Sequence, residues 1–112
     1  MRRRVTIIYK SLIMNDLCNI RNRIDRIDDQ LLALLLERFA LMKDVAEAKK
    51  ASDVPLTDSA REESILIRRS SEAPGYEDEV RDFFSSLMEL SKRVQRRYWP
   101  GGVFCGCADG FS

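Results

Sequence analysis

Two basic residues occupy positions where a hydrophobic residue is expected. From Leu17 onward, apolar residues recur at alternating steps of three and four, which predicts an amphipathic helix, and Arg38 and Lys49 fall on its apolar stripe. A buried cation is costly unless it is paired or binds a ligand. These two residues are eleven positions apart, or roughly 16 Å along a helix. Their long side chains could therefore lean toward each other and hold one small anion.

Arg21 lies on the same stripe but too far away to share that anion within one chain. It precedes Lys49 by 28 residues, which is about 42 Å along a straight helix. It could instead serve the ligand of a partner chain in an antiparallel dimer. The alternative is structural: Arg21 and Lys49 lie over apolar surface and Arg38 pairs with an acid. Only one acid, Asp28, shares the stripe with the three cations, which weakens that alternative for the set.

The segment "VPLTDSAREESIL", residues 54–66, combines a turn with the start of a helix. Asp58, Arg61 and Glu62 fall at this start, where a carboxylate is favourable but a cation opposes the helix dipole. Arg61 is therefore unusual there unless it has a ligand. Glu62 also has a structural explanation, because it fits a capping box with Ser59.

Ser91 and Gln95 are polar interruptions of a second apolar stripe, near the end of the chain. They are four residues apart, so they lie on adjacent turns of one helix face. A glutamine is also common at the edge of an apolar stripe, so a structural role stays open for Gln95.

The composition limits the kinds of protein that this chain can be. Its 112 residues suffice for one domain, and 19 basic against 18 acidic residues argue against a nucleic-acid binder. No apolar run approaches the ~20 residues of a membrane span. Three cysteines (Cys18, Cys105, Cys107) without any histidine form neither a disulfide framework nor a zinc site. We expect a cytoplasmic protein that needs no cofactor or metal.

The expected elements are three helices, so the predicted fold class is all-α. The first starts at a cap on Asn15 or Asp16 and runs for about 35 residues to a stop before Pro55. The second spans residues 59 to 70 or 71, and the third runs from about Tyr76 to a stop before Pro100. We expect an N-terminal extension (1–14), a helical domain (15–98) and a tail (99–112). The first helix is too long for its own chain to cover, which predicts an intertwined homodimer.

The chain resembles the all-helical AroQ-type chorismate mutases over residues 17–98. The resemblance rests on "IRNRIDRIDDQLLALLLERFALMKDVAEAKK", "VPLTDSAREESIL" and "SLMELSKRVQ", which occur in the family's order. It departs from the family in its N-terminal extension, in a slightly shorter connection around Pro74 and in its cysteine-containing tail. No departure falls on a residue singled out above.

The resemblance implies a role for each of those residues. Arg38, and Arg21 of the other chain, would bind the two carboxylates of chorismate, with help from Arg61 and Ser91. Lys49 would bridge a carboxylate and the ether oxygen. A hydrogen bond from Gln95 would reach the same ether oxygen, and the ring hydroxyl would contact Glu62 and the backbone at Asp58.

The implied activity is the intramolecular rearrangement of chorismate to prephenate, a step of the shikimate pathway in aromatic amino-acid biosynthesis. It needs no nucleophile, acid, base or cofactor, in keeping with a sequence that has no catalytic or metal motif. Two rival enzymes stay open: an isochorismate pyruvate lyase of the same fold, and an aminodeoxychorismate mutase. A third rival is a non-catalytic helical dimerisation module.

Overall fold

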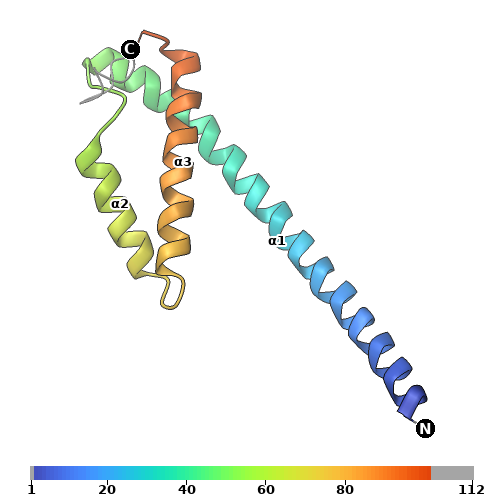
Figure 1. Cartoon of the computed structure of the whole chain (residues 1–112). Coiled ribbons are helices and arrows are strands. Elements are labelled where there is room, and N and C mark those ends of the chain that lie inside the picture. Colours follow the sequence, from blue (N-terminus) through green and yellow to red (C-terminus); the bar gives the residue numbers. More distant parts are fainter. Residues whose placement is uncertain (1, 102–112) are drawn as a thin grey trace. The chain divides into compact units, whose positions relative to one another are not determined.

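The computed structural model describes the backbone of residues 2–101 and the side chains of residues 15–101 (Figure 1). The chain forms three helices, α1 (Arg2–Ser52), α2 (Ser59–Ser71) and α3 (Glu77–Tyr98), and no β-strand occurs among the described residues. The predicted all-α, three-helix fold is confirmed. Cys105 and Cys107 of the predicted tail lie outside the described residues. The chain divides after Glu37 into two compact units.

The predicted start of the first helix is wrong. Helix α1 begins at Arg2 and not at a cap on Asn15 or Asp16, so it has 51 residues. No glycine or proline interrupts residues 2–52, and the arginine, leucine and isoleucine side chains of this stretch are compatible with a continuous helix. Asparagine and aspartate prefer helix caps, but this preference is weak beside a continuous run of residues that tolerate a helix.

The end of α1 agrees with the prediction. The helix stops at Ser52, and Asp53 takes a left-handed conformation with φ 56°. The Val54 amide then donates to the Lys49 carbonyl at 2.8 Å, which satisfies one of the last carbonyls of the helix. Pro55 follows and prevents continuation. This stop places the next residues, 54–58, beside the last turns of α1.

In the first unit, residues 1–37, the apolar stripe of α1 faces solvent. No side chain from Asn15 to Glu37 is buried. Large apolar residues of the stripe are 48–62% exposed: Ile20, Ile24, Ile27, Leu31 and Leu34. A long exposed apolar stripe of this kind is typical of a surface that binds another protein.

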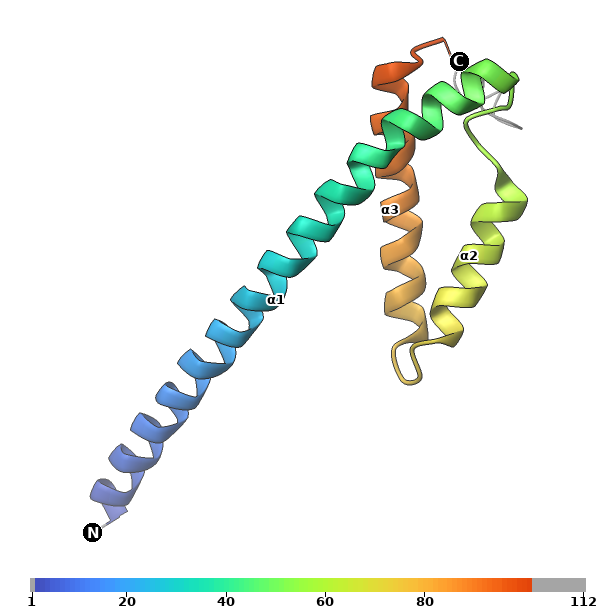
Figure 2. The same cartoon turned by 180° about the vertical axis from the view of Figure 1, so that it is seen from behind.

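The second unit contains the end of α1 together with α2 and α3. Helices α2 and α3 lie side by side, as both views show (Figures 1 and 2). The turn between them is the predicted one: the Tyr76 amide donates to the Ala73 carbonyl at 2.9 Å, and Gly75 has φ 89°, a conformation that favours glycine. The buried residues of this unit include Ala46, Leu56, Leu87 and Met88.

Helix α2 starts as predicted but is capped differently. Asp58 is the N-cap, and its Oδ1 accepts a hydrogen bond from the Arg61 amide at 3.0 Å. The predicted capping box of Ser59 and Glu62 is therefore wrong. Aspartate is among the strongest N-caps, and it stands one residue earlier. The Glu62 carboxylate is thus not used at the cap.

Among the described residues, no helix has the length and hydrophobicity needed to span a membrane.

Candidate active site

Seven of the eight predicted site residues line one cavity in the second unit. The cavity has a volume of about 190 Å³ and lies among the end of α1, the start of α2 and the second half of α3. Its lining includes these predicted residues: Arg38, Lys49, Asp58, Arg61, Glu62, Ser91 and Gln95. The eighth, Arg21, is an exposed residue of the first unit.

Arg38 reaches across from α1 to α3. Its Nη1 donates a hydrogen bond to Ser91 Oγ, and that hydroxyl donates in turn to the Leu87 carbonyl at 2.7 Å. Ser91 is only 4% exposed, so the contact fixes the guanidinium against a buried surface. Burial lowers the pKa of Arg38, and the positive charge of Arg61 lowers it further. An arginine nevertheless stays charged at neutral pH.

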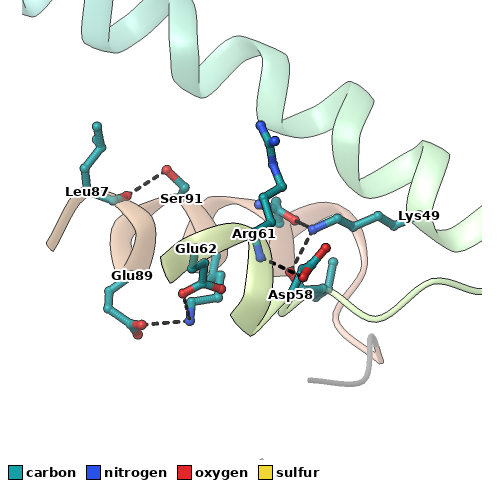
Figure 3. Close-up of polar contacts among 10 residues, drawn as sticks. Lys49, Asp58, Arg61, Glu62, Leu87, Glu89 and Ser91 are labelled. Carbon is teal, nitrogen blue, oxygen red and sulfur yellow. Dashed lines mark hydrogen bonds and ion pairs between the residues drawn. The ribbon is translucent and has the colours of Figure 1, made fainter. Parts of the chain in front are cut away.

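Lys49 lies one turn from the end of α1 and contacts the loop before α2 and helix α3 (Figure 3). Its Nζ donates to the Leu56 carbonyl at 2.7 Å and to Gln95 Oε1 at 3.3 Å. Burial lowers the pKa of Lys49, while the negative charges of Asp58 and Glu62 raise it in part. The lysine is therefore a cation that has lost part of its hydration and faces a cavity.

Gln95 is buried, with 5% of its surface exposed. Its Oε1 accepts a hydrogen bond from Lys49, which leaves the N–H donors of the NH₂ group available to another acceptor. The nearest partner of Nε2 is the thioether of Met42, at 3.4 Å, which is a weak acceptor. A stronger acceptor in the cavity, such as an ether or carboxylate oxygen, would satisfy this amide better.

The first turn of α2 presents charges in two directions. The Arg61 side chain points toward α1, whereas Glu62 Oε1 accepts from Lys92 Nζ of α3 at 3.4 Å (Figure 3). Among the described residues, no ion pair involves the guanidinium of Arg61 or Arg38 or the ammonium of Lys49. The cavity thus has three cations without a carboxylate partner, which suits a small dianion.

Sequence reasoning missed the apolar wall of the cavity and one charged residue beside it. The wall consists of Met42, Val45, Val54, Leu56, Ile65 and Met88. Several of these belong to the recognised apolar stripes, but periodicity does not distinguish a cavity wall from a packed core. Lys92 pairs with Glu89 at 2.7 Å on its own helix, which the spacing of three residues could have indicated. Its contact with Glu62 depends on the packing of α2 against α3.

The described residues contain no group of three or more histidine, cysteine or carboxylate side chains placed to hold a metal. The side chains that line the cavity offer three cations, two carboxylates, one amide and one hydroxyl. Such a set can bind two carboxylates and stabilise negative charge on a third oxygen.

Comparisons with known proteins agree with this chemistry. Residues 20–96 match the family model of chorismate mutase type II. The chain is 35% identical over 89 residues to a chorismate mutase of Methanocaldococcus jannaschii, an alignment that covers 77% of this chain and 90% of that protein. It is 32% identical over 95 residues to a bifunctional chorismate mutase/prephenate dehydratase of Aquifex aeolicus, covering 76% of this chain and 26% of that protein. No solved structure gives a significant match.

Proposed function

We propose that this chain, which belongs to the chorismate mutase type II family of isomerases, rearranges chorismate to prephenate. The reaction takes place in the cavity of the second unit. This reaction is a step of aromatic amino-acid biosynthesis. One observation carries the assignment of the site: the cavity combines three unpaired cations with a buried amide that has a spare donor.

The arginines select the conformation of the substrate. Chorismate has two carboxylates, and it reacts only when its enolpyruvyl side chain folds over the ring in a compact chair. Arg38 is fixed by Ser91, and Arg61 points toward α1, so two separated guanidinium groups face the cavity. Binding both carboxylates at this spacing favours the compact form, and such proximity effects can lower a barrier by several kcal/mol, roughly 7 or more in the best cases.

Lys49 and Gln95 act on the bond that breaks. As the ether C–O bond lengthens, negative charge develops on its oxygen, and both side chains can donate to that atom. Their mutual hydrogen bond fixes them before the substrate arrives, so little reorganisation is needed in the transition state. Removing one such donor typically costs about 10²–10³ in rate. The Glu62 carboxylate would accept from the ring hydroxyl, and the backbone at Asp58 would contact the same hydroxyl, which orients the ring.

A homodimer completes the site. The exposed apolar stripe of the first unit is the face that a second copy of α1 would cover, and Arg21 lies on this stripe. In an antiparallel arrangement the Arg21 of one chain would enter the cavity of its partner and bind a carboxylate. Each dimer would then have two composite cavities.

The composite site can be tested by mixing two inactive variants. Arg21→Ala removes the residue that a chain lends, and Lys49→Met removes one that it keeps. Subunits exchanged at random would give heterodimers with one intact cavity each, so about a quarter of the wild-type sites would return. Mixtures that stay as inactive as the separate variants, although exchange has occurred, would refute the lending of Arg21.

The reaction itself is tested by incubating the purified protein with chorismate and, in parallel, with isochorismate. A mutase converts chorismate to a product of unchanged mass and releases no pyruvate. Release of pyruvate from isochorismate would instead identify a lyase of the same fold. Turnover of neither compound would favour a helical dimerisation module or an aminodeoxychorismate mutase.

A further inference from the structure

Lys92 is a nearly buried ammonium that does not line the cavity but contacts a residue that does. Its Nζ lies 3.4 Å from Glu62 Oε1 and 2.7 Å from Glu89 Oε1. Both carboxylates are labelled in Figure 3. The Lys92 side chain is 12% exposed, compared with 26% for Glu62 and 69% for Glu89. A surface carboxylate thus anchors the ammonium on one side, and the ammonium holds a cavity carboxylate on the other.

This arrangement decides which cation Glu62 pairs with. The charge of Glu62 is close enough to Lys49 to raise the pKa of that lysine, yet the ion pair of Glu62 is with Lys92. Burial lowers the pKa of Lys92, but the hydrogen bond that its ammonium donates to Glu89 and the charges of Glu62 and Glu89 outweigh burial and raise this pKa. Lys92 thus keeps its charge more firmly than an ordinary lysine, and it gives Glu62 a cationic partner on α3.

We propose that Lys92 is a positioning residue of the rearrangement, which holds the Glu62 carboxylate toward α3 and so keeps Lys49 free for the ether oxygen. The inference rests on the proposed function, in which Glu62 accepts from the ring hydroxyl and Lys49 donates to the ether oxygen. The Lys92 ammonium explains why Glu62 and Lys49 can each serve the substrate. Without this ammonium, the Glu62 carboxylate would turn toward the unpaired cations of the cavity. There it would compete with the substrate carboxylates for Lys49 and Arg61.

The test uses Lys92→Met, which removes the ammonium and keeps most of the apolar stem. We expect kcat/KM for chorismate to fall about tenfold, a usual size for the coupling of two contacting charges. Lys92→Arg should recover most of the loss, because it restores the cation. The matched control is Arg81→Met, which breaks another ion pair between α2 and α3, Arg81 to Glu63 at 2.9 Å, away from the cavity. This control should leave kcat/KM unchanged.

A double-mutant cycle separates positioning from a general structural effect. If Lys92 acts through Glu62, then Lys92→Met should cost little more once Glu62→Gln has removed the carboxylate. An equal loss in both backgrounds would overturn the inference, and so would wild-type kinetics for Lys92→Met. Thermal unfolding followed by circular dichroism checks that the variant folds. If it does not, Glu89→Gln, which changes only the exposed anchor, should show a smaller loss that again vanishes in the Glu62→Gln background. A wild-type protein without turnover of chorismate would refute the proposed function and the positioning role with it, whereas an active wild type that Lys92→Met matches would refute the positioning role alone.

Discussion

Gln95→Glu should convert the enzyme into one that works only in acid. The amide of Gln95 is buried, and its NH₂ group has only a thioether as its nearest partner, so it can donate to the substrate at any pH. A carboxylate of the same shape can donate only when it is protonated. At neutral pH it would also be an anion 3.3 Å from the Lys49 ammonium, where it would pair with the second donor of the site.

The expected loss follows from these two effects. Removing one donor to a developing oxyanion costs about 10²–10³ in kcat, or roughly 3–4 kcal/mol. Pairing the new carboxylate with Lys49 weakens the other donor, so we expect a loss of at least about 10³ near pH 7. As the pH falls, the carboxylate gains a proton and becomes a donor, and the rate should rise. Lys49 lowers the pKa of the new group and burial raises it, so the direction is set and the midpoint is not.

The assay is the pH profile of chorismate turnover for the wild type, Gln95→Glu and Gln95→Leu. Gln95→Leu is the matched control, because it removes the donor without adding a titrating group, and its profile should be low and flat. The wild type should vary little between neutral and acidic pH, since the chain has no histidine. A flat, wild-type profile for Gln95→Glu would mean that Gln95 does not contact the breaking bond, and the assignment of α3 to the site would fail.

Three further predictions concern the cations and the dimer. Arg38→Ala should lower kcat/KM for chorismate by at least about 10². Its melting temperature should stay within a few degrees of the wild type, because the half-buried guanidinium has no carboxylate partner to lose. Normal turnover or unfolding of this variant would count against a role in binding. The kcat/KM of the wild type should fall at alkaline pH as Lys49 loses its proton. This fall should come below the ordinary lysine pKa of 10.5, because burial lowers the pKa of Lys49. A profile that stays level up to pH 10.5 would contradict the need for an ammonium at this position. The protein should sediment as a dimer at micromolar concentration, and Ile24→Lys in the exposed stripe should give inactive monomers, whereas an active monomeric wild type would exclude the composite site.

The three helices and the places where they end could be predicted from the sequence, but the first residue of α1 and the cap of α2 could not. Proline at position 55 and the pair Pro74–Gly75 end regular structure for steric reasons, and the observed breaks lie beside them. Asn15 and Asp16 are good caps but are equally tolerable within a long helix, so they do not mark the start of α1. The capping-box pattern favours Ser59 as the cap of α2, but Asp58 is the stronger single cap and is the one that the helix uses.

The three cations of the cavity could be recognised because each breaks a local rule. A cation on an apolar stripe or at a helix N-terminus is visible without any tertiary structure, as for Arg38 and Arg61. The apolar wall breaks no rule, since Met42 and Met88 look like ordinary core residues. The Lys92–Glu62 contact joins residues 30 positions apart, and only the packing of α2 on α3 brings them together.

The central claim is that the cavity is complementary to the compact, charge-separated transition state, and a stable bicyclic ether dicarboxylate that mimics this state tests it most directly. Its inhibition constant should be at least about a hundredfold below the KM for chorismate in the wild type, since enzymes bind such mimics far more tightly than substrates. Lys49→Met should abolish most of this advantage, because it removes the donor to the ether oxygen. A mimic that binds the wild-type protein no more tightly than chorismate does would contradict the account.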